Sequence, residues 1–295
     1  MMTSHPHRSA GFTLIEIVMV IVIIGIISGM VAVFVVKPVQ GYIDAVQRAE
    51  LTDSADVALR RLTRDVRLAL PNSLRVMTSG GNHYIEFIMT SNGGRYRDTS
   101  DGSTAGNFLS WTSANLTFDV LGPMPSNPAL APDDYIVVYN LGTGYAPADA
   151  YAAADPCTNC NRAKVTGISA NVVTLQFNPF SGQPPPLPFN GQSPPLPSPN
   201  ARFQIVPGGT KAVTYVCPTT AAGNLSRYAN YGFNATQIAP TGSPATLASN
   251  ATCTVDYTPT ATGRNGLLYI ELKLTDTPSG ESVTLFQQIH VDNAP

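Results

Sequence analysis

Charged residues are scarce in this sequence, and neither sign predominates. Lys, Arg, Asp and Glu together make up 12% of the 295 residues, whereas about 25% is typical of soluble proteins. The formal net charge is −2. Proteins that bind nucleic acids carry an excess of positive charge for the phosphate backbone, so the composition argues against nucleic acid as a partner.

Side chains that carry out catalysis or hold a metal are also scarce. The chain has only four His and four Cys, and it contains no Gly-x-Ser-x-Gly, P-loop or His-Glu-x-x-His string. We therefore expect a protein that is not an enzyme and that holds no cofactor. Calcium is the one ion left open. Its candidate ligands, none of them at EF-hand spacing, are Asp98, Asp101, Gly102, Asp133 and Asp134.

The apolar residues are concentrated near the N-terminus. From Phe12 to Val36 the only ionisable side chain is that of Glu16. A helix of this length spans about 37 Å, which is enough to cross a hydrocarbon core of about 30 Å. A cleaved secretory signal is the alternative, but its apolar part is usually only about 7–15 residues long. We therefore expect residues 12–36 to form a transmembrane helix.

Glu16 is unusual within this apolar run. A carboxylate inside a membrane helix costs on the order of 2.5–3.5 kcal/mol. Such a residue either has a function or lies close enough to the headgroups to be partly solvated. Glu16 is only the fifth residue of the run, so the energetics alone leave both interpretations open.

The residues around Glu16 form a specific signal. A short polar leader containing Arg8 precedes the string Gly11-Phe12-Thr13-Leu14-Ile15-Glu16, and the apolar run follows it. This arrangement resembles the class III signal of type IV pilins and of type II secretion pseudopilins. The resemblance implies that residues 1–11 are a leader, that prepilin peptidase cleaves after Gly11, and that the new N-terminus at Phe12 is methylated.

The same resemblance implies a role for Glu16, which would pair with the N-terminal amine of an adjacent subunit. An unpaired carboxylate and an unpaired ammonium are each costly where the dielectric constant is low, and pairing offsets much of that cost. The other partners implied are major and minor pilins, the inner-membrane assembly platform and membrane lipid. The implied location is the inner membrane, with a single span and a periplasmic head, and the pilus or cell surface after assembly.

A second helical pattern follows the apolar run. Apolar residues recur at three- and four-residue steps between charged ones, and Pro71-Asn72 marks the end. We expect an amphipathic helix over residues 37–70 that continues the first, is kinked near Pro38 and Gly41, and packs on a globular head. Its expected i,i+4 ion pairs are Asp44 with Arg48, Asp56 with Arg60, and Arg61 with Asp65.

Four arginines gather near the end of this helix, namely Arg60, Arg61, Arg64 and Arg67. Two carboxylates, Asp56 and Asp65, are interleaved with them. A basic group that is interrupted in this way is typical of a solvated face or a contact between subunits. It gives no support to a nucleic-acid site.

Residues 71–295 show almost no helical period. We expect an α+β protein whose long N-terminal helix packs on a β-rich head, built as an antiparallel sheet or a sandwich. The last two apolar runs flank Pro278-Ser279-Gly280 and predict a β-hairpin. The runs that predict strands are 83–89, 116–120, 135–139, 172–177, 203–206, 212–216, 267–274 and 283–291.

One segment of the head, residues 179–199, is rich in proline and repeats a nine-residue pattern. Proline has no amide proton to donate, so this segment can hardly join a sheet. We expect an exposed polyproline-like loop. Such a loop is either a rigid connection between strands or a docking element for another subunit.

The four cysteines allow two disulfides. Cys157 and Cys160 lie in a turn-like segment that no helix follows, and no second close pair supplies further metal ligands. A small loop disulfide or two free thiols therefore fit better than a redox or zinc site. Cys217 and Cys253 are the obvious second pair, although three pairings are formally open.

Several short strings in the head carry a further resemblance: Gly93-Gly94-Arg95-Tyr96-Arg97, Tyr215-Val216-Cys217, Leu225-Ser226-Arg227-Tyr228, Cys253 before Val255-Asp256-Tyr257, and Gly280-Glu281-Ser282-Val283-Thr284-Leu285 before His290-Val291. They look like the MshO family, minor pilins of the MSHA type IV pilus, and more distantly like the J-type minor pseudopilins. The resemblance implies a structural subunit that primes assembly or lies at the tip, with a consequence for adhesion. The alternatives are a secretion pseudopilin and, from a different class, a membrane-anchored periplasmic binding or enzyme domain.

Overall fold

The computed structural model describes residues 11–98, 106–152, 155–158, 160–181, 197–220, 222–259 and 265–295. Most of the expected leader, residues 1–10, and most of the proline-rich segment, residues 182–196, lie outside the described residues. The chain divides into two compact units, Met1–Glu50 and Leu51–Pro295. Each unit is described by itself.

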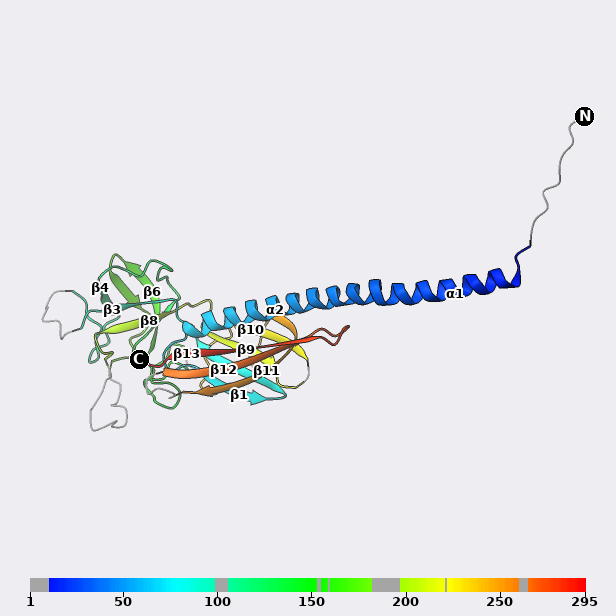
Figure 1. Ribbon diagram of the computed structural model, residues 1–295. Coiled ribbons are helices and arrows are strands. Elements are labelled where there is room, and N and C mark those ends of the chain that lie inside the picture. The colour runs from blue at the N-terminus through cyan, green and yellow to red at the C-terminus, as the bar shows by residue number, and fades with distance from the viewer. Residues whose placement is uncertain are drawn as a thin grey trace, which may run out of the picture. The chain divides into compact units, whose positions relative to one another are not determined.

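The first unit is helical (Figure 1). It contains α1 (Leu14–Val31), a π-helical turn η1 (Ala32–Val36) and the start of α2 (Lys37–Arg67). The sequence predicts a kink near Pro38 and Gly41, and the structure places an irregular turn that ends at Val36, two residues before Pro38. Proline lacks an amide proton and its ring clashes with the carbonyl four residues earlier. A widened π turn accommodates both effects.

The large apolar side chains in the described part of the first unit are exposed. None of the residues of α1 is buried, and the most apolar 18-residue window of the helix has a mean hydropathy of 3.0. The helix is therefore long and apolar enough to cross a membrane. Tyr42, Ile43 and Val46 in α2 are exposed as well. The fully buried residues of α2 begin at Ala55, and Leu51 packs against the same core while partly buried.

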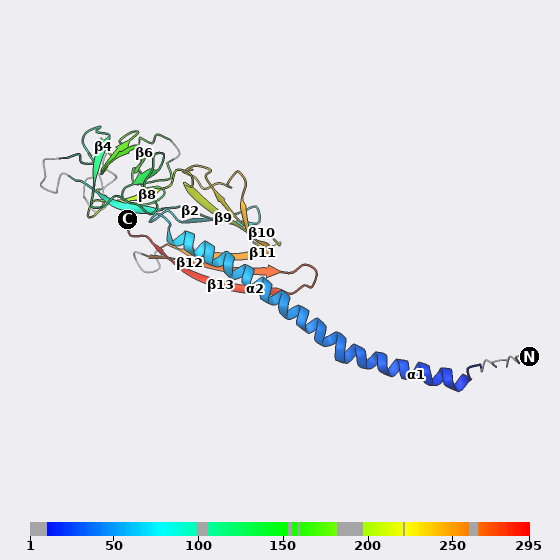
Figure 2. The same cartoon turned by 90° about the horizontal axis from the view of Figure 1, so that it is seen from above.

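The second unit contains a seven-stranded antiparallel sheet that packs against the C-terminal part of α2 (Figures 1 and 2). The order of its strands is β1-β2-β9-β10-β11-β12-β13. Their bounds are β1 Arg75–Ser79, β2 Asn82–Ile88, β9 Ala212–Pro218, β10 Gly223–Ala229, β11 Ala245–Thr258, β12 Asn265–Thr275 and β13 Ser282–Asp292.

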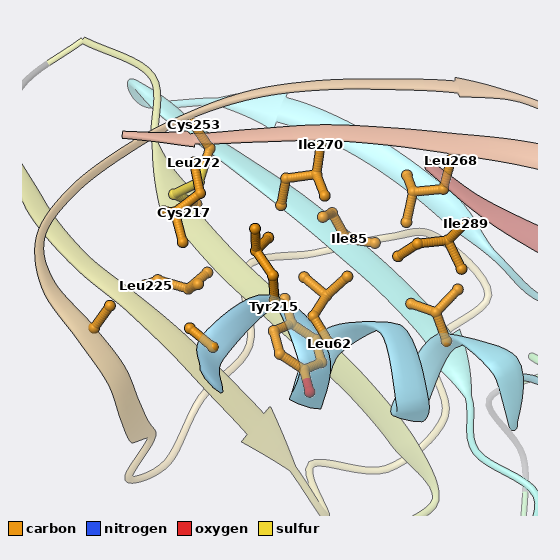
Figure 3. Close-up of a cluster of buried hydrophobic side chains, with 14 of the residues drawn as sticks. Leu62, Ile85, Tyr215, Cys217, Leu225, Cys253, Leu268, Ile270, Leu272 and Ile289 are labelled. Atoms are coloured by element: carbon orange, nitrogen blue, oxygen red, sulfur yellow. A yellow bond between two sulfur atoms is a disulfide. The ribbon is translucent and has the colours of Figure 1, made fainter. Parts of the chain in front are cut away.

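The main core lies between α2 and this sheet. Figure 3 shows Leu62 on the helix facing Tyr215 and Ile85 on the strands. The buried helical residues recur at three- and four-residue steps, so one stripe of the helix faces the sheet. Two members of the stripe, Ala55 and Ala58, are small, which allows the helix backbone to approach the strands closely. The full stripe is Ala55, Ala58, Leu59, Leu62 and Val66.

A buried ion pair also holds the helix to the sheet. The Arg227 Nε of β10 lies 2.7 Å from the Asp65 Oδ2 of α2, and the Tyr215 hydroxyl donates to the same oxygen at 2.9 Å. Asp65 is only 2% exposed. The sequence predicts a pair of Asp65 with Arg61, and this prediction is wrong because Asp65 lies on the packed side of the helix and binds Arg227. The predicted pair of Asp56 with Arg60 is present, at 2.7 Å.

A closed β-barrel is inserted between β2 and β9, which are neighbours in the sheet. Its strands follow one another around the barrel in the order β3-β4-β7-β6-β5-β8, and Tyr96, Phe118 and Phe203 lie in its core. The predicted single sheet or sandwich is therefore an open sheet with a barrel beside it. The bounds are β3 Asn92–Tyr96, β4 Thr117–Leu121, β5 Tyr135–Val137, β6 Arg162–Ser169, β7 Val172–Leu175 and β8 Arg202–Val206.

A third core cluster joins the barrel to the sheet. It brings together Ile88 of β2, Tyr135 of β5 and Phe233 from the loop after β10. The guanidinium of Arg162 lies 3.7 Å from the centre of the Phe233 ring and donates to the Ala150 and Ala152 carbonyls. Burial lowers the pKa of Arg162 to about 10. The cluster shows that the two β bodies share one folded unit.

A second buried polar network lies on the face of the sheet away from α2. The Glu86 carboxylate accepts from the Arg75 Nε at 2.9 Å and from the Tyr231 hydroxyl at 3.0 Å. Burial raises the pKa of Glu86 above its usual range, although Arg75 and Tyr231 oppose this. The Arg75 guanidinium also lies 3.7 Å from the centre of the Tyr151 ring. This network ties β1 and β2 to the loops that precede β6 and follow β10.

All the runs predicted as strands lie on observed strands, and the predicted hairpin is β12–β13. The fold class is therefore confirmed as α+β. Sequence patterns missed β1, β3, β6, β10 and β11. In β3 the two glycines weaken the signal, and β11 is rich in Ala, Ser, Thr and Asn, residues whose place in a strand depends on their neighbours.

We predict that Asp65→Ala lowers the free energy of unfolding by about 3–5 kcal/mol, because Arg227, whose side chain is only 14% exposed, then loses its carboxylate partner. Urea unfolding of the full chain in detergent, followed by near-ultraviolet circular dichroism of the tyrosines, measures the change. The matched control is Asp56→Ala, which removes an exposed ion pair on the same helix. It should lower the free energy of unfolding by no more than about 1 kcal/mol. Equal losses in the two variants would contradict the prediction.

Candidate functional site

The expected cleavage site lies in non-helical chain directly before α1. Gly11, Phe12 and Thr13 have no regular secondary structure, and Phe12 is 79% exposed. Among the described residues, none beyond its chain neighbours comes within 4 Å of the position that a Cβ of Gly11 would take. The Gly11–Phe12 peptide bond is therefore open to a protease that needs extended substrate.

Thr13 and Glu16 form a capping box at the start of α1. The Glu16 Oε2 accepts from the Thr13 amide and hydroxyl, both at 3.3 Å, and the Glu16 amide donates to the Thr13 hydroxyl at 3.4 Å. A carboxylate at this position also faces the positive end of the helix dipole. Cleavage after Gly11 would create an ammonium on Phe12, the residue next to the Thr13 amide that Glu16 already binds.

Residues 6–32 match the prokaryotic N-terminal methylation motif. The protein is therefore type IV pilin-like at its N-terminus. The matched residues include the Gly11–Phe12 bond, Glu16 and all of α1. Together with the apolar helix, the motif fits a membrane-anchored protein that prepilin peptidase processes and that interacts with other pilins. No curated protein and no solved structure matches the chain.

The structure joins the cysteines in the two pairs that their spacing favours. Cys217 and Cys253 form a disulfide between β9 and β11, the two neighbours of β10, at the edge of the main core (Figure 3). Cys157 and Cys160 form the second disulfide, in the loop before β6. All four sulfur-bearing residues are buried. Their environment is that of structural crosslinks rather than of a reactive dithiol.

The loop carboxylates considered for calcium have protein partners where they are described. Asp133 forms an ion pair with Lys164 at 2.8 Å, which lowers the pKa of its carboxyl. Asp134 accepts from the Ala131 and Gly208 amides. Asp101 and Gly102 lie outside the described residues. Within the described part of the chain, no three His, Cys, Asp or Glu residues gather as metal ligands would.

Three of the four clustered arginines share a surface hollow with the last strand. The hollow has a volume of about 410 Å³ and is lined by Arg60, Thr63, Arg64, Arg67, Leu68 and Gln287. Gln287 comes from β13, far away in sequence, so the helical pattern alone could not reveal this neighbour. Arg61 does not line the hollow. The structure thus separates the arginine group into a stripe beside β13 and one residue outside it.

We predict that the two disulfides differ in their contribution to stability. A crosslink lowers the entropy of the unfolded chain and so raises the free energy of unfolding. The expected gain is about 4 kcal/mol for Cys217–Cys253, which are 36 residues apart, and about 2 kcal/mol for Cys157–Cys160, which are three apart. Replacing each pair with alanine and measuring urea unfolding of the full chain tests this. A larger loss for the Cys157–Cys160 pair would contradict it.

Proposed function

We propose that this protein is a non-catalytic minor pilin of an MSHA-type type IV pilus, which is incorporated into the fibre or primes its assembly. The observation that carries the proposal is the methylation motif, with Glu16 at the fifth position of the mature chain. The apolar surface of α1 supports it, because such a surface needs either lipid or other apolar helices around it.

The proposed mechanism follows from this requirement. Lipid covers the exposed apolar side chains of α1 while the subunit waits in the inner membrane. Assembly then transfers α1 from lipid into a bundle of neighbouring helices, where its apolar surface stays covered. The Glu16 carboxylate leaves its own cap and pairs with the Phe12 amine of a neighbour, since both charges are too costly to leave unpaired in such a bundle.

The build of the head supports a minor rather than a major subunit. The sheet and α2 alone form a complete core, and the barrel adds a second body between β2 and β9. A head of this bulk suits a subunit present in few copies, at the tip or at sites of initiation. Adhesion is then a consequence of where the head lies.

A pseudopilin of type II secretion, of the J type, is the second candidate, because the same N-terminal motif serves both systems. Deleting the gene separates the two. Loss of surface fibres with normal export of secreted enzymes supports the pilus role. Loss of export with normal fibres supports the pseudopilin role.

We predict that the protein isolated from its native membrane begins at N-methylated Phe12. Prepilin peptidase cleaves after Gly11 and methylates the new amine, so the mass of the N-terminal peptide measures both events. A chain that still begins at Met1, or one that is cut near Ser28, would rule out the pilin role. A membrane-anchored domain of a different class would then be the better interpretation.

We predict that Glu16→Ala abolishes incorporation of this subunit into fibres, as measured by immunoblotting of sheared filaments. The matched control is Thr13→Val, which removes the hydroxyl of the capping box but leaves the carboxylate available to a neighbour. This control should be incorporated close to the normal level. Normal incorporation of the Glu16→Ala subunit would contradict the pairing role. If neither variant is incorporated, the defect comes from the lost capping box of α1 and not from a lost pair between subunits.

A further inference from the structure

The last strand, β13, has one free edge. It lies at the end of the sheet and pairs with β12 at every position from Ser282 to Asp292, without a shift of register. No described strand pairs with its other edge. An edge of this kind presents a row of backbone donors and acceptors to any extended chain.

Nothing on β13 protects this edge in the usual ways. Natural edges are short, bulged, or interrupted by Lys or Pro, whereas β13 spans eleven residues and contains none of these. The opposite edge of the sheet, β1, has only five residues. On β13 the Gln287 side chain donates to the Gln288 carbonyl, and Phe286 is 70% exposed. Both ends of the sheet are edges, but β1 offers only a short edge, whereas β13 offers a long one for further pairing.

A positively charged stripe runs beside this edge. Arg60, Arg64 and Arg67 line the hollow in which Gln287 of β13 also lies. Asp56 pairs with Arg60. The Asp65 Oδ1 lies 3.9 Å from the Arg64 Nε, but the Asp65 carboxylate is already bound by Arg227. The hollow thus keeps an excess of positive charge. It favours a partner that carries carboxylates.

The spacing of the stripe is close to that of an extended chain. The four-residue step from Arg60 to Arg64 rises about 6 Å and the three-residue step from Arg64 to Arg67 about 4.5 Å, whereas two residues of a β-strand rise about 6.6–6.8 Å. Side chains at alternate positions of a strand point to the same face. An added strand with carboxylates at every second position would therefore present them to the arginines, while its backbone pairs with β13.

We propose that β13 binds an extended acidic segment of a neighbouring filament subunit, which adds to the sheet as a further strand. The proposal rests on the proposed function, because that function supplies the neighbouring subunit. Backbone pairing provides the affinity, and the arginine stripe selects the acidic face of the segment. Phe286, on the opposite face of the strand, provides an apolar contact for the alternate side chains.

The arginine stripe also disfavours a second copy of this chain as the occupant. Two β13 edges that pair around a twofold axis form one continuous sheet, with both helices on the same face. The two arginine stripes would then lie opposite each other, and like charges in such a position repel. The geometry therefore points to a different subunit.

The test uses the full chain in detergent and a fluorescent heptapeptide, Thr-Glu-Val-Glu-Val-Glu-Thr, with blocked ends. Binding is measured by fluorescence anisotropy, and hydrogen exchange locates the peptide. We expect saturable binding and slower exchange of amides in β13. Two probe controls should bind at least about tenfold more weakly: the same peptide with Gln in place of Glu, and one whose alternate amides are N-methylated.

Matched variants of the protein test the stripe. The triple variant Arg60→Glu, Arg64→Glu, Arg67→Glu should bind the acidic peptide at least about tenfold more weakly. Arg61→Glu changes an exposed arginine of the same helix that does not line the hollow, and it should stay within about twofold. Near-ultraviolet circular dichroism checks that both variants are folded.

Three results would overturn the proposal: no saturable binding up to about 1 mM peptide, exchange protection outside β13, or equal effects of the triple variant and Arg61→Glu. A concentration-dependent dimer that protects β13 would assign the edge to a second copy instead. Failure here is distinguishable from failure of the proposed function, because a mature N-terminus at methylated Phe12 is measured independently of the peptide.

Discussion

The packing of one stripe of α2 on the seven-stranded sheet is the contact on which the head depends. The stripe runs from Ala55 to Val66 and covers the inner face of strands that have no second sheet against them. Removing the helix would expose that face to water. The Asp65–Arg227 pair fixes the rotation of the helix on the sheet, because a turned helix would bury a charge without its partner.

The apolar residues are distributed differently on α1 and on the C-terminal part of α2. The residues of α1 present apolar side chains in every direction, as a helix does that is surrounded by lipid or by other helices. From Ala55 onward the apolar residues keep to one stripe, as on a helix that covers a protein core. Lipid or other helices can therefore cover α1, while the head has a core of its own.

The two β bodies of the head differ in whether their strands have a free edge. The barrel closes all of its strands and leaves no free edge within them, whereas the sheet ends in a long unprotected strand. A closed body adds bulk without adding a pairing surface. The sheet therefore carries the inferred contact with a neighbour, whereas the closed barrel offers no strand edge for such pairing.

The sequence by itself determined the local features: the N-terminal methylation motif, the apolar run, the helical stripe, the C-terminal hairpin and the strands rich in β-branched residues. Each of these depends on residues close together in the chain, so period and composition reveal them. Only the tertiary structure decided that Asp65 pairs with Arg227 rather than Arg61, that Gln287 lies beside the arginines, and that the strands between β2 and β9 close into a barrel. These features join residues far apart in the chain, and the free energy that selects them comes from burial and long-range pairing, which no local pattern records.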